Sequence, residues 1–150
     1  MNKIIIIGTE PPCPRCGLLG NIIKAKVEQF QIDAAVRHLS YLDEESKKFA
    51  ESIGLETGTA KDVAKRLNLE IDKEKLALKL QSKSDNSNSE YIAYNNCNWS
   101  YELDEFLRPY ENRAKEVGIL MTPILIINGK LVHQGSVPSM EKIDGWLRDL

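Results

Sequence analysis

The pattern of apolar and polar positions at the start of the chain predicts a strand, a helix and a second strand. Residues 4–7 form a continuous β-branched run, which is typical of a strand buried on both faces of a sheet. Apolar residues then recur at helical spacing, so a helix is expected from about residue 13 to residue 30. Residues 34–42 are expected to form the second strand. Two strands joined by one helix make a right-handed βαβ unit, in which the strands are parallel.

The middle of the chain, from residue 43 to about residue 100, changes to the pattern of short amphipathic helices. Thr59 has the residue type and spacing to cap one of them. The polar stretch 82–90 is expected to be a loop. Strong helical periodicity returns at residues 100–117, where Pro109 predicts a kink or a restart.

The end of the chain predicts a hairpin followed by a helix. Residues 124–127 form an apolar strand, Asn128 and Gly129 are the strongest two-residue turn signal, and residues 131–133 return antiparallel. Residues 137–139 then open a helix with a single apolar stripe, made of Met140, Ile143, Trp146, Leu147 and Leu150. The predicted order is therefore βαβ, a set of helices, and ββα.

Composition and charge are those of an ordinary globular domain. The 150 residues are 42% hydrophobic and 28% charged, and we expect them to form one domain, residues 1–150. The net charge is −2, and basic residues are dispersed among acidic ones, which disfavours nucleic acid as a partner. The apolar run at the start ends at Gly8, too short for a secretory or membrane segment. We therefore expect a cytoplasmic protein with no membrane partner.

The candidate chemistry lies in the sequence Cys13-Pro14-Arg15-Cys16, which should sit at the start of the first helix. Unpaired N–H groups and the helix dipole stabilise a thiolate there, and the charge of Arg15 acts in the same direction. The pKa of Cys13 should therefore lie below that of a free thiol. Cys13 is then the nucleophile that forms a mixed disulfide, and Cys16 is the thiol that resolves it.

Other uses of the cysteines are weighed beside this one. A lone CxxC motif also serves as half of a zinc site, or as two incidental thiols. The third cysteine, Cys97, is either a redox thiol or a small buried residue. His38 and His133 lie far apart in sequence, and no second CxxC, CxxH or HxxxH accompanies the pair, so no metal site is predicted.

The cysteine motif and the later hairpin together resemble the small redox-active disulfide proteins of the thioredoxin superfamily. The residues that carry the resemblance are GTEPPCPRC at 8–16, GILMTPILIINGK at 118–130 and GSVPS at 135–139. The resemblance implies an α/β thioredoxin-like fold, with a four-stranded mixed sheet in the order 2-1-3-4 and flanking helices. Residues 43–100 would form a helical insertion after the second strand.

The resemblance also implies a site and an activity. It implies that Pro123 is cis and faces the cysteine pair, and that Thr122 hydrogen-bonds an extended substrate. The predicted catalytic residues are Cys13 and Cys16. The predicted substrate-binding residues are Pro14, Arg15, Met121, Thr122 and Pro123.

The expected function is that of a thiol-disulfide oxidoreductase without a cofactor. It would act on protein or small-molecule disulfides, with an unidentified reductant restoring the thiols. The alternative is a non-catalytic module that binds a metal or a partner. The chain departs from the family in having Ile7 where thioredoxins carry a buried acid, so no base for Cys16 is evident, although Glu10 is close in sequence.

Overall fold

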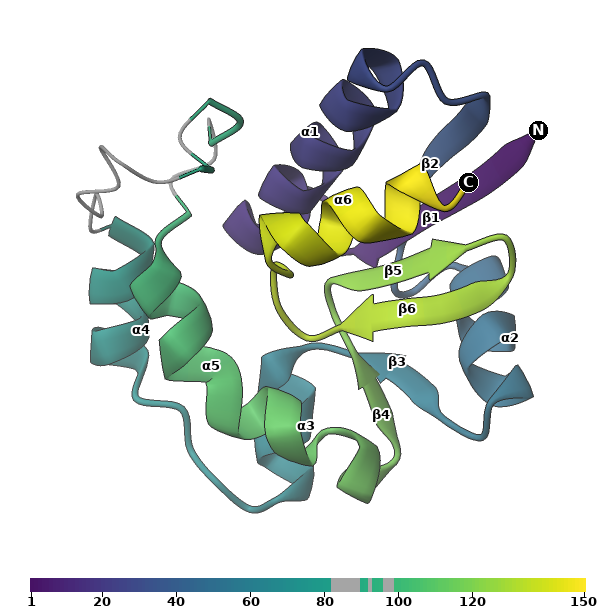
Figure 1. Cartoon of the computed structure of the whole chain (residues 1–150). Helices are drawn as coiled ribbons and strands as arrows, with labels where there is room; N and C mark the ends of the chain where they lie inside the picture. Colours follow the sequence, from purple (N-terminus) through teal and green to yellow (C-terminus); the bar gives the residue numbers. More distant parts are fainter. Residues whose placement is uncertain (82–89, 92, 96–98) are drawn as a thin grey trace.

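The central element of the computed structural model is a four-stranded mixed sheet (Figure 1). The structure describes residues 1–81, 90–91, 93–95 and 99–150. β1 (Asn2–Gly8) pairs in parallel with β2 (Ala34–Ser40), and α1 (Pro14–Gln29) connects them. On its other side β1 pairs antiparallel with β5 (Ile124–Ile127), which pairs antiparallel with β6 (Lys130–Gln134). The predicted βαβ unit and the terminal hairpin are therefore present.

Helices cover both faces of this sheet because its central strands are apolar on both sides. Ile4 and Ile6 of β1 pack with α1 and α6 (Met140–Arg148) in the larger core. Ile7 points to the opposite face, where it packs with Ala50 of α2 (Glu44–Ser52). The continuous isoleucine run of β1 thus serves two cores, as its sequence predicts.

The strand order differs from the expected one. Two further short strands, β3 (Glu56–Gly58) and β4 (Ile119–Met121), pair in parallel as a separate sheet, so the order in the main sheet is β2-β1-β5-β6 instead of 2-1-3-4. The predicted hairpin strands occupy the expected sheet positions but are the fifth and sixth along the chain. Sequence reasoning missed β3 and β4 because three residues are too few to establish an alternating pattern.

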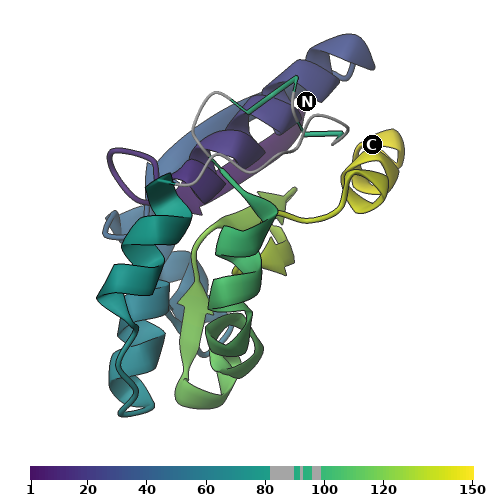
Figure 2. The ribbon, with the colours of Figure 1, turned by 90° about the vertical axis from the view of Figure 1, so that its left-hand side faces the viewer.

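The segment after α2 is not purely helical, because it contains β3. It continues with α3 (Ala60–Arg66) and α4 (Lys73–Gln81), and Figures 1 and 2 show α4 alongside α5 (Tyr101–Arg113). Thr59 caps α3 as predicted, in a reciprocal capping box with Asp62. The predicted loop at 82–90 lies, apart from residue 90, outside the described residues.

Pro109 does not restart the helix around it. α5 runs through Pro109 to Arg113, followed by the 3-10 turn Lys115–Val117. Leu103 and Leu107, both N-terminal to Pro109, bury one face of α5, and this packing stabilises the helix although Pro109 has no N–H to donate. The turn of the last hairpin matches its prediction, since Asn128 and Gly129 both have positive φ values, 50° and 79°.

Candidate functional site

The cysteine pair lies where β1 ends and α1 begins. Cys13 is the N-cap residue of α1, and Pro14 occupies the first turn, where its missing N–H leaves no bond unmade. The backbone N–H of Cys13 donates to the Thr9 hydroxyl at 2.9 Å, which fixes the approach of the chain to the helix. Both cysteines are free, with no disulfide between them.

The two sulfur atoms are close together but differ in exposure. Their Sγ atoms lie 3.1 Å apart, and the backbone N–H of Cys16 donates to Cys13 Sγ at 3.4 Å. Cys13 is half-buried, whereas Cys16 is 0% exposed. A disulfide partner approaching from solvent therefore meets Cys13 first.

The pKa values of the two thiols are shifted in opposite directions from that of a free cysteine. The hydrogen bond from the Cys16 thiol is the largest effect that lowers the pKa of Cys13, to about 6, against the opposing effect of burial. The Cys16 backbone N–H and the charge of Arg15 lower it further. The pKa of Cys16 is raised by its hydrogen bond to Cys13, by burial and by the charge of the Cys13 thiolate. Near neutral pH the pair therefore holds one thiolate, on Cys13.

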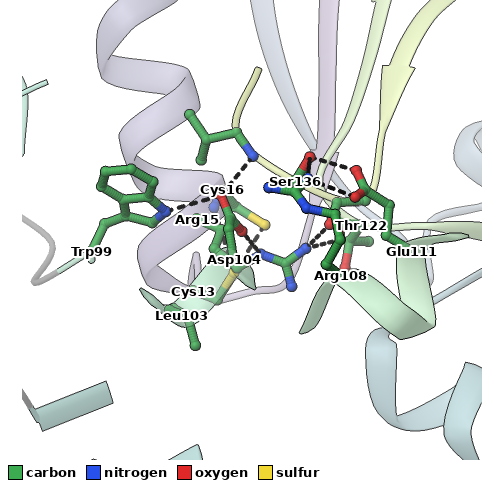
Figure 3. A network of polar contacts seen from close by, with 12 residues as sticks. Cys13, Arg15, Cys16, Trp99, Leu103, Asp104, Arg108, Glu111, Thr122 and Ser136 are labelled. Carbon is green, nitrogen blue, oxygen red and sulfur yellow. Dashed lines mark hydrogen bonds and ion pairs between the residues drawn. The ribbon is translucent and has the colours of Figure 1, made fainter. Parts of the chain in front are cut away.

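Arg15 connects the cysteine motif to the later motif. Its Nη2 donates to the backbone carbonyl of Thr122 at 3.0 Å and also to the carbonyl of Gly135 (Figure 3). Thr122 precedes Pro123, and the peptide bond between them is cis. The structure therefore brings together the two motifs that the sequence analysis singled out, through one guanidinium group.

A comparison with protein families finds a match to the later motif. The sequence model of a family described as a thioredoxin domain matches residues 83–148. This stretch begins after the cysteine pair and contains the cis-proline bond, the β5–β6 hairpin and α6. Residues 83–148 are therefore similar to a thioredoxin domain. No curated protein and no solved structure matches the chain.

The similarity of residues 83–148 to a thioredoxin domain, together with the close cysteine pair, suggests a redox-type function. The buried surroundings of the pair, however, contain a residue that sequence reasoning missed. Asp104 of α5 is 2% exposed, and its Oδ1 lies 2.9 Å from Arg15 Nε. Asp104 Oδ2 accepts hydrogen bonds from Trp99 Nε1 at 3.2 Å and from the Val137 backbone N–H at 3.0 Å.

The environment of Asp104 explains how a carboxylate is tolerated there. Burial raises the pKa of the Asp104 carboxyl, and Arg15, followed by the two N–H donors, opposes this effect. A sequence signal was available, because Asp104 lies between Leu103 and Leu107 on the buried face of an amphipathic helix. An acid at such a position requires a buried partner.

A second polar cluster lies beside the first and joins α5 to the β6–α6 connection. Arg108 Nη1 donates to Glu111 at 2.7 Å and to the Ser136 hydroxyl at 3.1 Å, and Ser136 in turn donates to Glu111 (Figure 3). His133 Nε2 lies 3.0 Å from the same hydroxyl, and burial lowers the pKa of His133. These contacts hold the segment that contains Gly135, and hence one of the carbonyls bound by Arg15.

Most of the predicted substrate-binding residues are buried within the protein. Arg15, Met121, Thr122 and Pro123 are buried, and Pro14 is half-buried. The backbone N–H of Thr122 donates to the Gly58 carbonyl of β3 at 2.9 Å, while its own carbonyl accepts from Arg15. That Thr122 hydrogen-bonds an extended substrate stays a prediction.

The two histidines weighed for metal binding do not come together. His38 lies on β2 and His133 on β6, the two edge strands of the main sheet. Across the described part of the chain, no group of three or more histidine, cysteine or acidic side chains has an arrangement that would hold a metal ion. Cys97 lies outside the described residues.

Among the helices that the structure describes, none combines the length and the apolar character needed to cross a membrane.

Proposed function

We propose that this protein is a thiol-disulfide oxidoreductase that uses the Cys13/Cys16 couple on protein or small-molecule disulfides. The observation that carries the proposal is the unequal pair itself. Two thiols lie 3.1 Å apart, one half-buried with a pKa lowered to about 6 and the other fully buried with a raised pKa. Such a pair provides a nucleophile and a resolving thiol in fixed positions.

The proposed reaction has two exchange steps. The Cys13 thiolate attacks one sulfur of the substrate disulfide, the substrate S–S bond breaks, and one half leaves as a thiolate. Cys16 then gives up its proton and attacks Cys13 Sγ, which forms the Cys13–Cys16 disulfide and releases the second half as a thiolate. The substrate gains two electrons and the pair loses two. An external dithiol or thiol reductant returns them.

Arg15 has a positioning role in this proposal. Its guanidinium faces inward to Asp104 and Thr122, so it acts on the charge of Cys13 from inside the protein. We propose that Met121, Thr122 and Pro123 support the guanidinium of Arg15, which donates to the Thr122 carbonyl. Direct contact with the substrate is proposed for Pro14, which is half-buried beside Cys13.

The test is exchange with an excess of a peptide disulfide, followed by mass spectrometry of the protein. Reduced wild-type protein should lose both thiols and gain an internal disulfide. The Cys13→Ser variant should not react, and the Cys16→Ser variant should accumulate a mixed disulfide at Cys13. Persistence of both thiols in the wild type would exclude the proposal. Retention of stoichiometric zinc that is lost in Cys13→Ser would favour a metal-binding module instead.

A further inference from the structure

A hollow beside Cys16 contains groups that the exchange reaction described above does not use. Its volume is about 310 Å³, and it lies between α1, β2 and the loop that follows β1. Cys16 lines it from α1, His38 from β2 and Glu10 from the loop. Cys16 must lose a proton in the second exchange step, so a proton acceptor in this hollow has a chemical task.

Gly8 keeps Cys16 and His38 facing each other across this hollow. A Cβ atom at Gly8 would lie 2.6 Å from Cys16 Sγ and 3.2 Å from His38 Nε2. Any other residue would therefore collide with the sulfur and stand between the two groups. Because both atoms lie so near one point, they are no more than about 6 Å apart, which is the span of a proton transfer through one water molecule.

His38 has the hydrogen-bonding state that a base in this position requires. Its Nε2 is buried and has no hydrogen-bond partner among the residues that the structure describes. Its Nδ1 lies 3.8 Å from Glu10 Oε2, on the opposite side of the ring. An unpartnered buried ring nitrogen is costly unless it serves a purpose, and an imidazole gains and loses protons near neutral pH.

We infer that His38 accepts the proton of Cys16, through one water molecule, as Cys16 attacks the mixed disulfide at Cys13. This inference rests on the dithiol exchange proposed above. Cys16 Sγ forms the new bond to Cys13 Sγ, the bond from Cys13 to the substrate sulfur breaks, and the electron pair leaves on the substrate thiolate. The proton ends on His38 Nε2. In the reverse direction the imidazolium returns it to Cys16.

Charged side chains of both signs surround His38. Glu10 supplies a negative charge near Nδ1, and Lys24 and Arg37 line the same hollow with positive charges. The charge of Arg37 is balanced by Glu45 of α2, with two contacts of 3.1 Å and 2.8 Å. Glu10 lies on the Nδ1 side of the ring, so Nε2 is the ring nitrogen on the side of Cys16.

The experiment measures the two exchange steps separately with the aromatic disulfide DTNB. In a Cys97→Ser background, attack by reduced Cys13 releases the first equivalent of thionitrobenzoate, and attack by Cys16 releases the second. Stopped-flow absorbance resolves the two phases as a function of pH. The variants are His38→Gln, which keeps a polar side chain without a titrating group, and Lys130→Gln as an exposed control on β6.

We expect the second phase of His38→Gln to be slowed at least about tenfold near neutral pH, the lower end of what a general base contributes. The pH profile of this phase should also differ between the wild type and His38→Gln, because in the variant only thiolate formed in equilibrium with solvent reacts. The first phase, and both phases of Lys130→Gln, should be unchanged.

A second variant separates a proton acceptor from a packing residue. In His38→Ala, added imidazole should accelerate the second phase and leave the first unchanged, whereas a residue that only fills space gives no such rescue. A His38→Gln second phase with the wild-type rate and pH profile would overturn the inference while leaving the dithiol exchange intact. Absence of either phase in the wild type would instead refute the exchange itself.

Discussion

The buried pair of Arg15 and Asp104 leads to the most quantitative prediction. In Asp104→Ala, Arg15 loses its only described acidic partner, at 2.9 Å, and Trp99 Nε1 and the Val137 N–H lose their acceptor. Removing one member of a buried ion pair typically destabilises a protein by about 3–5 kcal/mol. We expect a loss in this range, because Asp104 is 2% exposed and solvent has little access to the orphaned donors.

The assay is urea unfolding of the reduced protein, followed by circular dichroism. With a slope of about 1–3 kcal/mol per molar urea, the unfolding midpoint should fall on the order of 2 M. Asp104→Asn should lose less, since its amide oxygen still accepts one hydrogen bond. Glu116→Ala, which removes an exposed partner of Arg113, is the control and should change the midpoint within experimental error.

The double variant Arg15→Met/Asp104→Leu tests whether the loss comes from an unpaired charge. Replacing both members by apolar side chains removes the orphaned guanidinium, so this variant should be clearly more stable than Asp104→Ala. The reasoning would be refuted if Asp104→Ala were no less stable than the Glu116→Ala control. It would also be refuted if the double variant lost the sum of the two single losses.

Three further predictions concern the cysteine pair and its surroundings. The rate of alkylation of Cys13 should follow a titration near pH 6. Cys16→Ala should move this midpoint to higher pH, because the hydrogen bond from the Cys16 thiol is the largest effect that lowers the pKa of Cys13. An unchanged midpoint would contradict that role of Cys16. The pKa of Cys13 falls from 9.0 to about 6 on folding, so reduced wild type should gain stability over Cys13→Ala between pH 6 and pH 9, by at most about 1.4 kcal/mol per pH unit. A gain that instead appeared as pH fell would have the wrong sign. Gly8→Ala should lower the free energy of unfolding by about 1–3 kcal/mol, because the added methyl group collides with Cys16. Gly145→Ala lies in open space on α6 and should raise the free energy of unfolding by about 0.5–1 kcal/mol. Equal shifts of the melting temperature in the two variants would exclude this account.

The parts of the fold that sequence predicted are those set by local patterns. The isoleucine run of β1, the Asn128-Gly129 turn and the Thr59 cap each depend on a few neighbouring residues, and each is present. β3 and β4 escaped prediction because a three-residue strand is stabilised by its partner across the sheet. Sequence periodicity carries no information about such a partner.

In the candidate site, too, the sequence predicted the features that depend on neighbouring residues and missed those that depend on distant ones. The thiol chemistry of Cys13 follows from its place at a helix start, which sequence reveals. The inward turn of Arg15 did not follow, because it depends on Asp104 and on carbonyls from distant segments. His38 was considered only as a metal ligand, since its approach to Cys16 depends on the pairing of β1 with β2 and on the absence of a side chain at Gly8.

The contacts of Arg15 also set the order in which the site can be assembled. Cys13 and Cys16 are three positions apart, yet Arg15 between them binds carbonyls 107 and 120 positions later in the chain. Contacts over such separations close last, because the entropy of a long loop must be lost first. The hydrogen bond between the two cysteines needs only the start of α1, whereas the charged neighbourhood of the pair is complete only once the β6–α6 connection has folded onto Arg15. The thiols of the site are thus local, but their electrostatic environment depends on both ends of the chain.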